Sequence, residues 1–339
     1  MRVPVSVVAW GLAGGLVSAT LVAPATASAS TTAGAQAAAA CVPAKNIQAI
    51  IDDSGSMSGT DPTRLRVQAM NLLIDALAAS TTLGATEFGT SVADVFAPAA
   101  VGPTAPAMKN ALNAAIQADN GATDYNLAFS TARAVNPGAT ARIFLTDGGH
   151  NSGAYANAHL NPAPQAQTPT YVIGFSPGLS GTTDQARLQQ IANETGGAYY
   201  ALPDAQALQS VMNDIQTRLT CQSATKTFVD NIKPGKSKKH GVKIKKKSRS
   251  AQLTLSWTSP LDTFKIKKLR IVRNGRVVAV KGRNLKVKTK KGTTYLVIKV
   301  TKLTPGKLKF KVKNTAAGSG APEVTVTTQV SQSKKKSGK

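Results

Sequence analysis

The spacing of hydrophobic positions along the chain changes near residue 222. Before that point, short apolar runs alternate with segments in which apolar residues recur every three or four positions, the period of a helix. Strands are predicted at residues 46–52, 142–146, 171–175 and 198–200, a strand pair at 82–96, and helices at 62–79, 105–117, 125–135, 184–194 and 204–219. Alternating strands and helices predict an α/β fold with a doubly wound, mostly parallel sheet.

After residue 222 the apolar residues alternate with polar ones, which is the period of a strand. Strands are predicted at residues 242–245, 253–257, 269–272, 277–280, 285–288 and 308–312. Asn274-Gly275 separates two of these runs and predicts a type I′ hairpin. Seven or eight strands without a helix predict a small antiparallel β-sandwich.

The first forty residues predict export. Arg2 precedes an apolar stretch of small residues, and Ala-x-Ala sites follow it, so residues 1–29 are expected to be a cleaved signal peptide and 30–40 a flexible Ala-rich leader. An uncleaved membrane anchor is the alternative, but glycines and hydroxyl residues make this stretch a poor spanning helix. We therefore expect a secreted or extracellular protein. Association with a cell surface is compatible with this expectation.

The two cysteines, Cys41 and Cys221, flank the α/β part. In an exported protein such a pair predicts a disulfide, which would join the two ends of that domain. Lipidation of Cys41 is the alternative, and it would leave Cys221 without a partner.

Charge divides the chain at the same place as the hydrophobic pattern. The formal net charge of +25 combines a net −4 up to Cys221 with a net +29 beyond it. Such a division indicates two functional units. We predict an α/β domain at 41–221, a Lys-rich β-sandwich at 222–330 and a basic disordered tail at 331–339.

Polar residues follow the predicted strands of the α/β part at the points where they end. They are Asp52, Ser54 and Ser56 after the first strand, Thr123 before a helix, and Asp147 after the central strand. Ligands of open α/β sheets bind at the carboxyl ends of the strands, where these residues are expected to meet. Two carboxylates and three hydroxyls form an all-oxygen set that suits a hard cation such as Mg²⁺.

These five residues resemble the metal-ion-dependent adhesion site of the von Willebrand factor type A family. Leu145-Thr146-Asp147-Gly148, residues 171–175 and residues 191–200 extend the resemblance over about residues 45–220. It implies that the five side chains hold Mg²⁺, Mn²⁺ or Ca²⁺, with a free position for an Asp or Glu of a protein partner. The alternative is that they only cap helices and turns. Asp53 and Asp124 beside them are interpreted as turn or cap residues.

Other chemistry is not indicated. No Walker loop or His-Glu-x-x-His motif is present, so we expect no enzyme activity. Glu87 is interpreted as a strand residue rather than a base. His150 belongs to no His/Cys cluster that would indicate zinc.

The basic half poses a separate question. LTLSWTSP at residues 253–260, the Asn-Gly hairpin and residues 303–306 resemble the bacterial pre-peptidase C-terminal β-sandwich, although only Asp262 remains of the acidic residues after the Trp-containing strand. The lysines favour attraction to an anionic cell-wall polymer or glycan. Nucleic acid is not indicated, because few aromatic residues lie among them. The alternative is a solvated face that protects strand edges.

Together these features predict a secreted, bacterial adhesion protein. A metal site would bind a carboxylate-bearing protein, while the basic domain associates with polyanions. The alternative is a structural or polyanion-binding wall protein whose metal site is vestigial or only stabilising.

Overall fold

The computed structural model describes residues 42–160, 168–175, 181–202, 208–221, 224–316 and 322–332. The predicted signal peptide at 1–29, the leader at 30–40, Cys41 and most of the basic tail lie outside these residues, so the expectations about them stay predictions. Within the described ranges, no helix is both long and apolar enough to cross a membrane.

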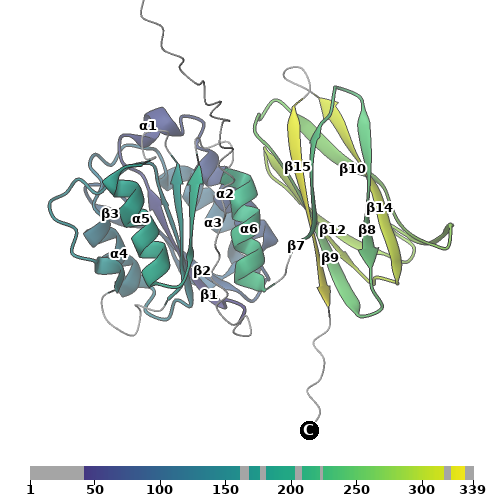
Figure 1. Ribbon diagram of the computed structural model, residues 1–339, viewed down its shortest axis with the longest axis horizontal. Coiled ribbons are helices and arrows are strands. Elements are labelled where there is room, and N and C mark those ends of the chain that lie inside the picture. Colours follow the sequence, from purple (N-terminus) through teal and green to yellow (C-terminus); the bar gives the residue numbers. More distant parts are fainter. Residues whose placement is uncertain are drawn as a thin grey trace, which may run out of the picture. The chain divides into compact units, whose positions relative to one another are not determined.

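A six-stranded sheet with the order β3-β2-β1-β4-β5-β6 forms the centre of the α/β part (Figure 1). Its strands are β1 (Asn46–Asp52), β2 (Thr82–Phe88), β3 (Val92–Ala100), β4 (Ala141–Thr146), β5 (Thr170–Phe175) and β6 (Ala198–Leu202). Only the edge strand β3 is antiparallel to its neighbour, and the other pairs are parallel. The predicted mostly parallel sheet is confirmed.

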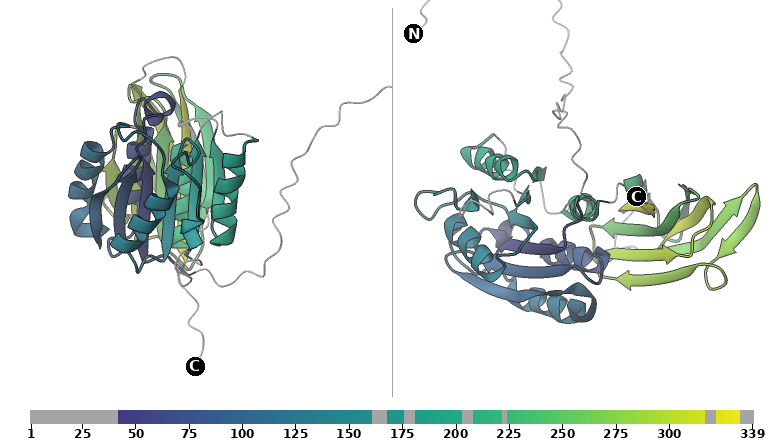
Figure 2. Two further views of the ribbon diagram at one scale, coloured as in Figure 1. Left: turned by 90° about the vertical axis from the view of Figure 1, so that its left-hand side faces the viewer. Right: turned by 90° about the horizontal axis from the view of Figure 1, so that it is seen from below.

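Helices cover both faces of this sheet (Figure 2). One face packs against α2 (Leu65–Ala76), α3 (Val101–Ala115) and α6 (Leu208–Thr220), and the other against α4 (Tyr125–Val135) and α5 (Thr183–Glu194). The short α1 (Met57–Thr60) and the 3-10 turn η1 (Ala158–Leu160) complete the described helices. Because both faces of β1 are covered, Ile47, Ile50 and Ile51 are all buried, as expected of a central parallel strand.

The helix predicted at 62–79 is shorter than expected. Arg64 has a left-handed backbone with φ 53°, so the helix begins only at Leu65, and it ends at Ala76. Asp61 still caps this helix, because its carboxylate accepts the backbone N–H groups of Leu65 at 2.6 Å and Arg66 at 2.9 Å. The predicted start of the helix was therefore wrong.

The basic part is built of two antiparallel sheets (Figure 1). One has the order β11-β10-β14-β8 and the other β12-β13-β9-β15-β7. The strands are β7 (Ala224–Asn231), β8 (Ser237–Ile244), β9 (Ser248–Trp257), β10 (Thr263–Arg273), β11 (Arg276–Val280), β12 (Lys286–Lys291), β13 (Tyr295–Thr301), β14 (Gly306–Ala316) and β15 (Glu323–Gln332). Apolar residues from both sheets share one core, which confirms the predicted sandwich.

The hairpin between β10 and β11 has the geometry that Asn-Gly favours. Asn274 and Gly275 both have positive φ, 48° and 78°, and Arg273 pairs with Arg276 across the turn. Placing a β-branched residue in this left-handed backbone region costs about 1–2 kcal/mol. We expect Gly275→Val to lower the free energy of unfolding of the β-part by about that amount, measured by urea denaturation. Gly275→Asn is the control, since Asn tolerates positive φ, and equal losses in both variants would contradict the explanation.

Candidate metal centre

Three loops meet where the parallel strands β1 and β4 end. The turn after β1 and the loop before α4 are joined by the backbone, since Gly55 N–H donates to Gly121 O at 2.9 Å and Asn120 N–H donates to Asp53 O at 3.0 Å. Gly121 has φ 63°, and a Cβ there would collide with Thr90 Oγ1. A glycine is therefore required for this close approach.

Four of the five predicted ligands lie in one hydrogen-bonded group. Asp52 Oδ1 accepts the backbone N–H of Ser54 at 2.9 Å, and the hydroxyls of Ser54 and Ser56 lie 3.2 Å apart. The Ser56 hydroxyl in turn donates to Asp147 Oδ1 at 2.8 Å. The structure thus gathers oxygen atoms from the ends of two neighbouring strands, β1 and β4, as the sequence predicted.

Thr123 lies in the third loop. Its backbone N–H donates to Asn151 Oδ1 at 2.7 Å and its carbonyl accepts from Asn151 N–H at 3.0 Å, so the loop is held in place from the segment after β4. Thr123 is only 2% exposed. Among the described contacts, none joins the Thr123 hydroxyl to the other four residues, and its role as a ligand stays a prediction.

The electrostatics of the group fit a cation. Burial raises the pKa of Asp52 to about 6, and the neighbouring charge of Asp147 adds to the effect. Burial likewise raises the pKa of Asp147. Two carboxylates that repel one another in a desolvated site would both be stabilised by a divalent cation between them. Among the described residues, no three Asp, Glu, His or Cys side chains form a metal-binding group, so a cation here would need the hydroxyls.

The sequence did not identify several side chains that hold the carboxylates. Thr146 donates its hydroxyl to Asp52 Oδ2 at 2.6 Å, and the Thr60 hydroxyl donates to Asp147 Oδ2. The buried Tyr125 hydroxyl lies 3.3 Å from the Thr146 hydroxyl. Thr146 could have been found from its place beside Asp147, whereas nothing local marks Thr60.

A buried ion triad was also missed. Arg66 pairs with Asp53 at 2.9 Å and with Asp61 at 3.1 Å, and the three side chains are at most 1% exposed. Asp53 also accepts the backbone N–H groups of Gln117 at 3.0 Å and Ala118 at 2.7 Å. The residue interpreted as a simple turn residue therefore fastens the loop that leads to Thr123.

The neighbouring candidates have structural contacts. Asp124 caps α4 by accepting the N–H of Leu127 at 3.1 Å, which confirms its interpretation. Glu87 lies on β2 and accepts from the Asn120 amide at 2.9 Å. His150 Nδ1 accepts the backbone N–H of Tyr125 at 3.1 Å.

Only one of the two cysteines of the predicted disulfide lies among the described residues. Cys221 follows α6, and the backbone N–H of Ala44 donates to Leu219 O at 2.8 Å, which brings the start of the described chain next to the end of that helix. Cys41 lies outside the described residues, so the Cys41–Cys221 bridge stays a prediction.

Comparison with known families agrees with this geometry. Residues 46–214 match the model of the von Willebrand factor type A domain. This part of the chain is a von Willebrand factor type A domain. The resemblance seen in the sequence is thereby confirmed for the domain.

Solved structures give a broader comparison. A von Willebrand factor type A protein from Catenulispora acidiphila is 16% identical, with a TM-score of 0.43, over 86% of this chain and 59% of its own. The proximal thread matrix protein 1 of the mussel byssus is 18% identical (TM-score 0.43) over 57% of this chain and 50% of its own. The PilB minor pilin of Streptococcus sanguinis is 14% identical (TM-score 0.41) over 51% of this chain and 60% of its own. A search of curated proteins found no match.

Proposed function

We propose that the von Willebrand factor type A domain binds a protein partner through a divalent cation. The cation, Mg²⁺ or else Mn²⁺ or Ca²⁺, would be held by Asp52, Ser54, Ser56, Thr123 and Asp147. The observation that carries the proposal is the hydrogen-bonded group that brings two buried carboxylates together with the hydroxyls of the buried Ser54 and the exposed Ser56. Such oxygen donors match the preference of hard cations.

The arrangement favours adhesion over catalysis. With two carboxylates and neutral hydroxyls, the cation would keep enough positive charge to attract a further carboxylate from outside. Ser56 is exposed, so an Asp or Glu of a partner can approach from that side. The Glu87 carboxylate accepts a hydrogen bond from the Asn120 amide, and we do not assign it as a base for the candidate metal site. We infer a non-enzymatic binding role.

The rest of the chain supports a secreted, cell-surface role in a bacterium. The predicted signal peptide would export the protein, and the basic β-sandwich would associate with an anionic cell-wall polymer or glycan through long-range attraction. The resemblance of residues 253–306 to the pre-peptidase C-terminal sandwich is part of this proposal. The second candidate is a polyanion-binding wall protein whose metal site is vestigial or only stabilising.

Binding of carboxylate peptides separates these candidates. We expect the full chain to capture members of an immobilised library of Asp-containing peptides in Mg²⁺, and to lose them in EDTA or when Asp is replaced by Asn. Thr123→Ala should weaken this binding at least about tenfold, which corresponds to about 1.4 kcal/mol.

Thr63→Ala, an exposed threonine outside the site, is the matched control and should bind normally. If chelation and Thr123→Ala both leave peptide binding intact, the adhesion proposal fails and the second candidate is favoured.

A further inference from the structure

The outward face of the sheet β11-β10-β14-β8 carries a regular grid of cations. Alternate residues of β14 point inward and are buried, namely Leu308, Phe310 and Val312, so the lysines between them point outward. Strand register places outward cations of β10 and β8 directly beside them. We call this set the lysine face, and its members are Lys239, Lys243, Lys265, Lys267, Arg270, Lys307, Lys309, Lys311 and Lys313.

The grid is dense. Neighbouring strands lie about 4.8 Å apart and successive outward residues on a strand roughly 6.8 Å apart, so nine cations occupy roughly 10 by 20 Å. Several of these cations lie directly opposite another cation on the neighbouring strand. Lys267 is paired with Lys311, and Lys307 is paired with Lys243. Like charges in such positions destabilise a sheet. Among the described residues, none of the nine forms an ion pair with an Asp or Glu.

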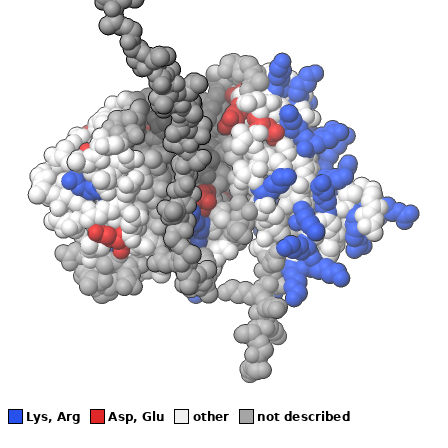
Figure 3. All heavy atoms as spheres, viewed as in Figure 1, with Lys and Arg blue, Asp and Glu red and all other residues white. Residues whose placement is uncertain are grey.

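Edge protection does not account for this face. Lysines that prevent strands from pairing belong on edge strands. The order β11-β10-β14-β8 makes β10 and β14 interior strands, and these two carry seven of the nine cations. Figure 3 shows Lys and Arg side chains gathered over this part of the surface. A repulsive grid on interior strands indicates that an anionic ligand neutralises it.

The chemistry of the face selects among anions. Eight of the nine cations are lysines, whose ammonium is a point charge that binds phosphate oxygens without a bidentate geometry. The outward positions of β8, β10 and β14 hold no aromatic side chain. Sugar rings and nucleic-acid bases commonly stack on such side chains. A flexible chain with repeating phosphates and no rings fits best.

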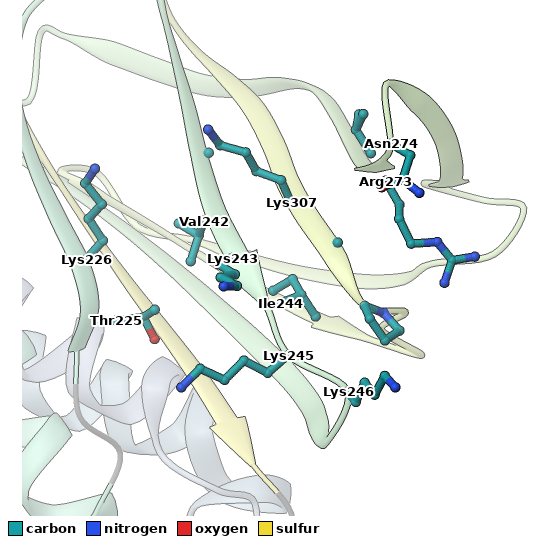
Figure 4. Close-up of a pocket in the computed structure, with 14 residues that line it drawn as sticks. Thr225, Lys226, Val242, Lys243, Ile244, Lys245, Lys246, Arg273, Asn274 and Lys307 are labelled. Carbon is teal, nitrogen blue, oxygen red and sulfur yellow. The ribbon is translucent and has the colours of Figure 1, made fainter.

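A groove continues the face at one end. Lys243 and Lys307 also line a hollow of about 820 Å³ (Figure 4). Four further cations line it, from β7, the turn after β8 and the β10–β11 hairpin: Lys226, Lys245, Lys246 and Arg273. Its lining also includes the apolar Val242 and Ile244, and none of its lining residues is acidic. A polymer on the lysine face can therefore extend into the groove without meeting a negative charge.

We propose that the lysine face and this groove bind a linear polyol-phosphate polymer, with its phosphodiesters over successive rows of lysines. This inference rests on the proposed association of the β-sandwich with a polyanion. It adds a defined surface and one chemical class of ligand.

The test uses the full chain and immobilised poly(glycerol phosphate), with polygalacturonate and duplex DNA as alternative ligands, between about 50 and 200 mM salt. The variant Lys307→Gln/Lys309→Gln/Lys311→Gln removes three cations from the interior strand β14. The matched control, Lys286→Gln/Lys288→Gln/Lys291→Gln, removes three exposed cations from β12 in the other sheet. Both variants change the net charge equally.

We expect the β14 variant to bind poly(glycerol phosphate) at least about tenfold more weakly and with a smaller salt dependence, because each lost phosphate contact lowers the slope. The control should stay within about twofold, since its lysines make no contact with the polymer. The β14 variant should melt no lower than the parent, because like-charge pairs are removed.

If both variants lose the same affinity for poly(glycerol phosphate), the lysine face is not the binding surface. The proposed general association with a polyanion would remain. Tighter binding of polygalacturonate or DNA than of poly(glycerol phosphate) would overturn the choice of ligand. Absence of binding to all three ligands by the parent chain would overturn the proposed polyanion association itself.

Discussion

Asp147→Ala is expected to abolish saturable Mg²⁺ and Mn²⁺ binding, measured by calorimetric titration of the full chain. Asp147 is one of two carboxylates in the group, and it accepts hydrogen bonds from Ser56 and Thr60. Without it, a divalent cation would retain a single carboxylate among neutral hydroxyls. We expect the affinity to fall at least about 100-fold, or about 2.7 kcal/mol.

Asp94→Ala is the matched control, because it removes an exposed carboxylate of the same domain and changes the net charge equally. It should bind Mg²⁺ as the parent does. A parent chain that binds neither cation would make the five residues structural, and the search for function would move to the basic sandwich.

Arg66→Met is expected to destabilise the von Willebrand factor type A domain by about 3–5 kcal/mol. Arg66 is fully buried and is the cationic partner of both Asp53 and Asp61. Its removal leaves two buried carboxylates without a counter-charge, which costs far more than the loss of a surface pair. Guanidinium denaturation followed by circular dichroism measures the change.

The control for this variant is Arg187→Met. Arg187 pairs with Asp184 at 3.1 Å, but both side chains are about one-third exposed. Such pairs contribute about 0–1 kcal/mol. Comparable losses in the two variants would show that the triad does not act as a buried unit. Since Asp53 also fastens the loop before Thr123, the Arg66→Met chain is expected to bind Mg²⁺ more weakly as well.

Much of the architecture was predictable because it depends on local periodicity. The helix at 125–135 was predicted with its observed bounds, and the strand at 46–52 likewise. The hairpin at Asn274-Gly275 follows from the backbone freedom of two adjacent residues. The start of α2 was missed because Arg64 has a left-handed backbone, which no pattern in the sequence marks.

Strands without alternation were harder to find. Residues 295–301 form β13, but their apolar run is nearly continuous, and four of the strand's seven residues follow one another as buried positions. β7 and β15 are rich in threonine, and the apolar face of β15 is limited to Val324, Val326 and Val330. Their place in the sheet depends on pairing with β9 and with each other, which is a long-range property.

The candidate site likewise combines residues that the sequence predicted with residues that only the structure revealed. Asp52, Ser54 and Ser56 share one turn and Asp147 ends a strand, so the sequence predicted their meeting from the parallel order of the sheet. Thr60 and Arg66 act on these loops from positions that no motif marks.

The sequence by itself determined the two fold classes, the charge boundary near residue 222 and the oxygen donors at the ends of β1 and β4. These follow from the periodicity of hydrophobic positions, the net charge and the order of the strands, which can all be read from the sequence. Only the tertiary structure decided that Arg66 joins Asp53 to Asp61, and that seven cations lie on interior strands rather than at edges. Burial and sheet order arise from contacts between residues distant in sequence, and those contacts set the energy of each charge.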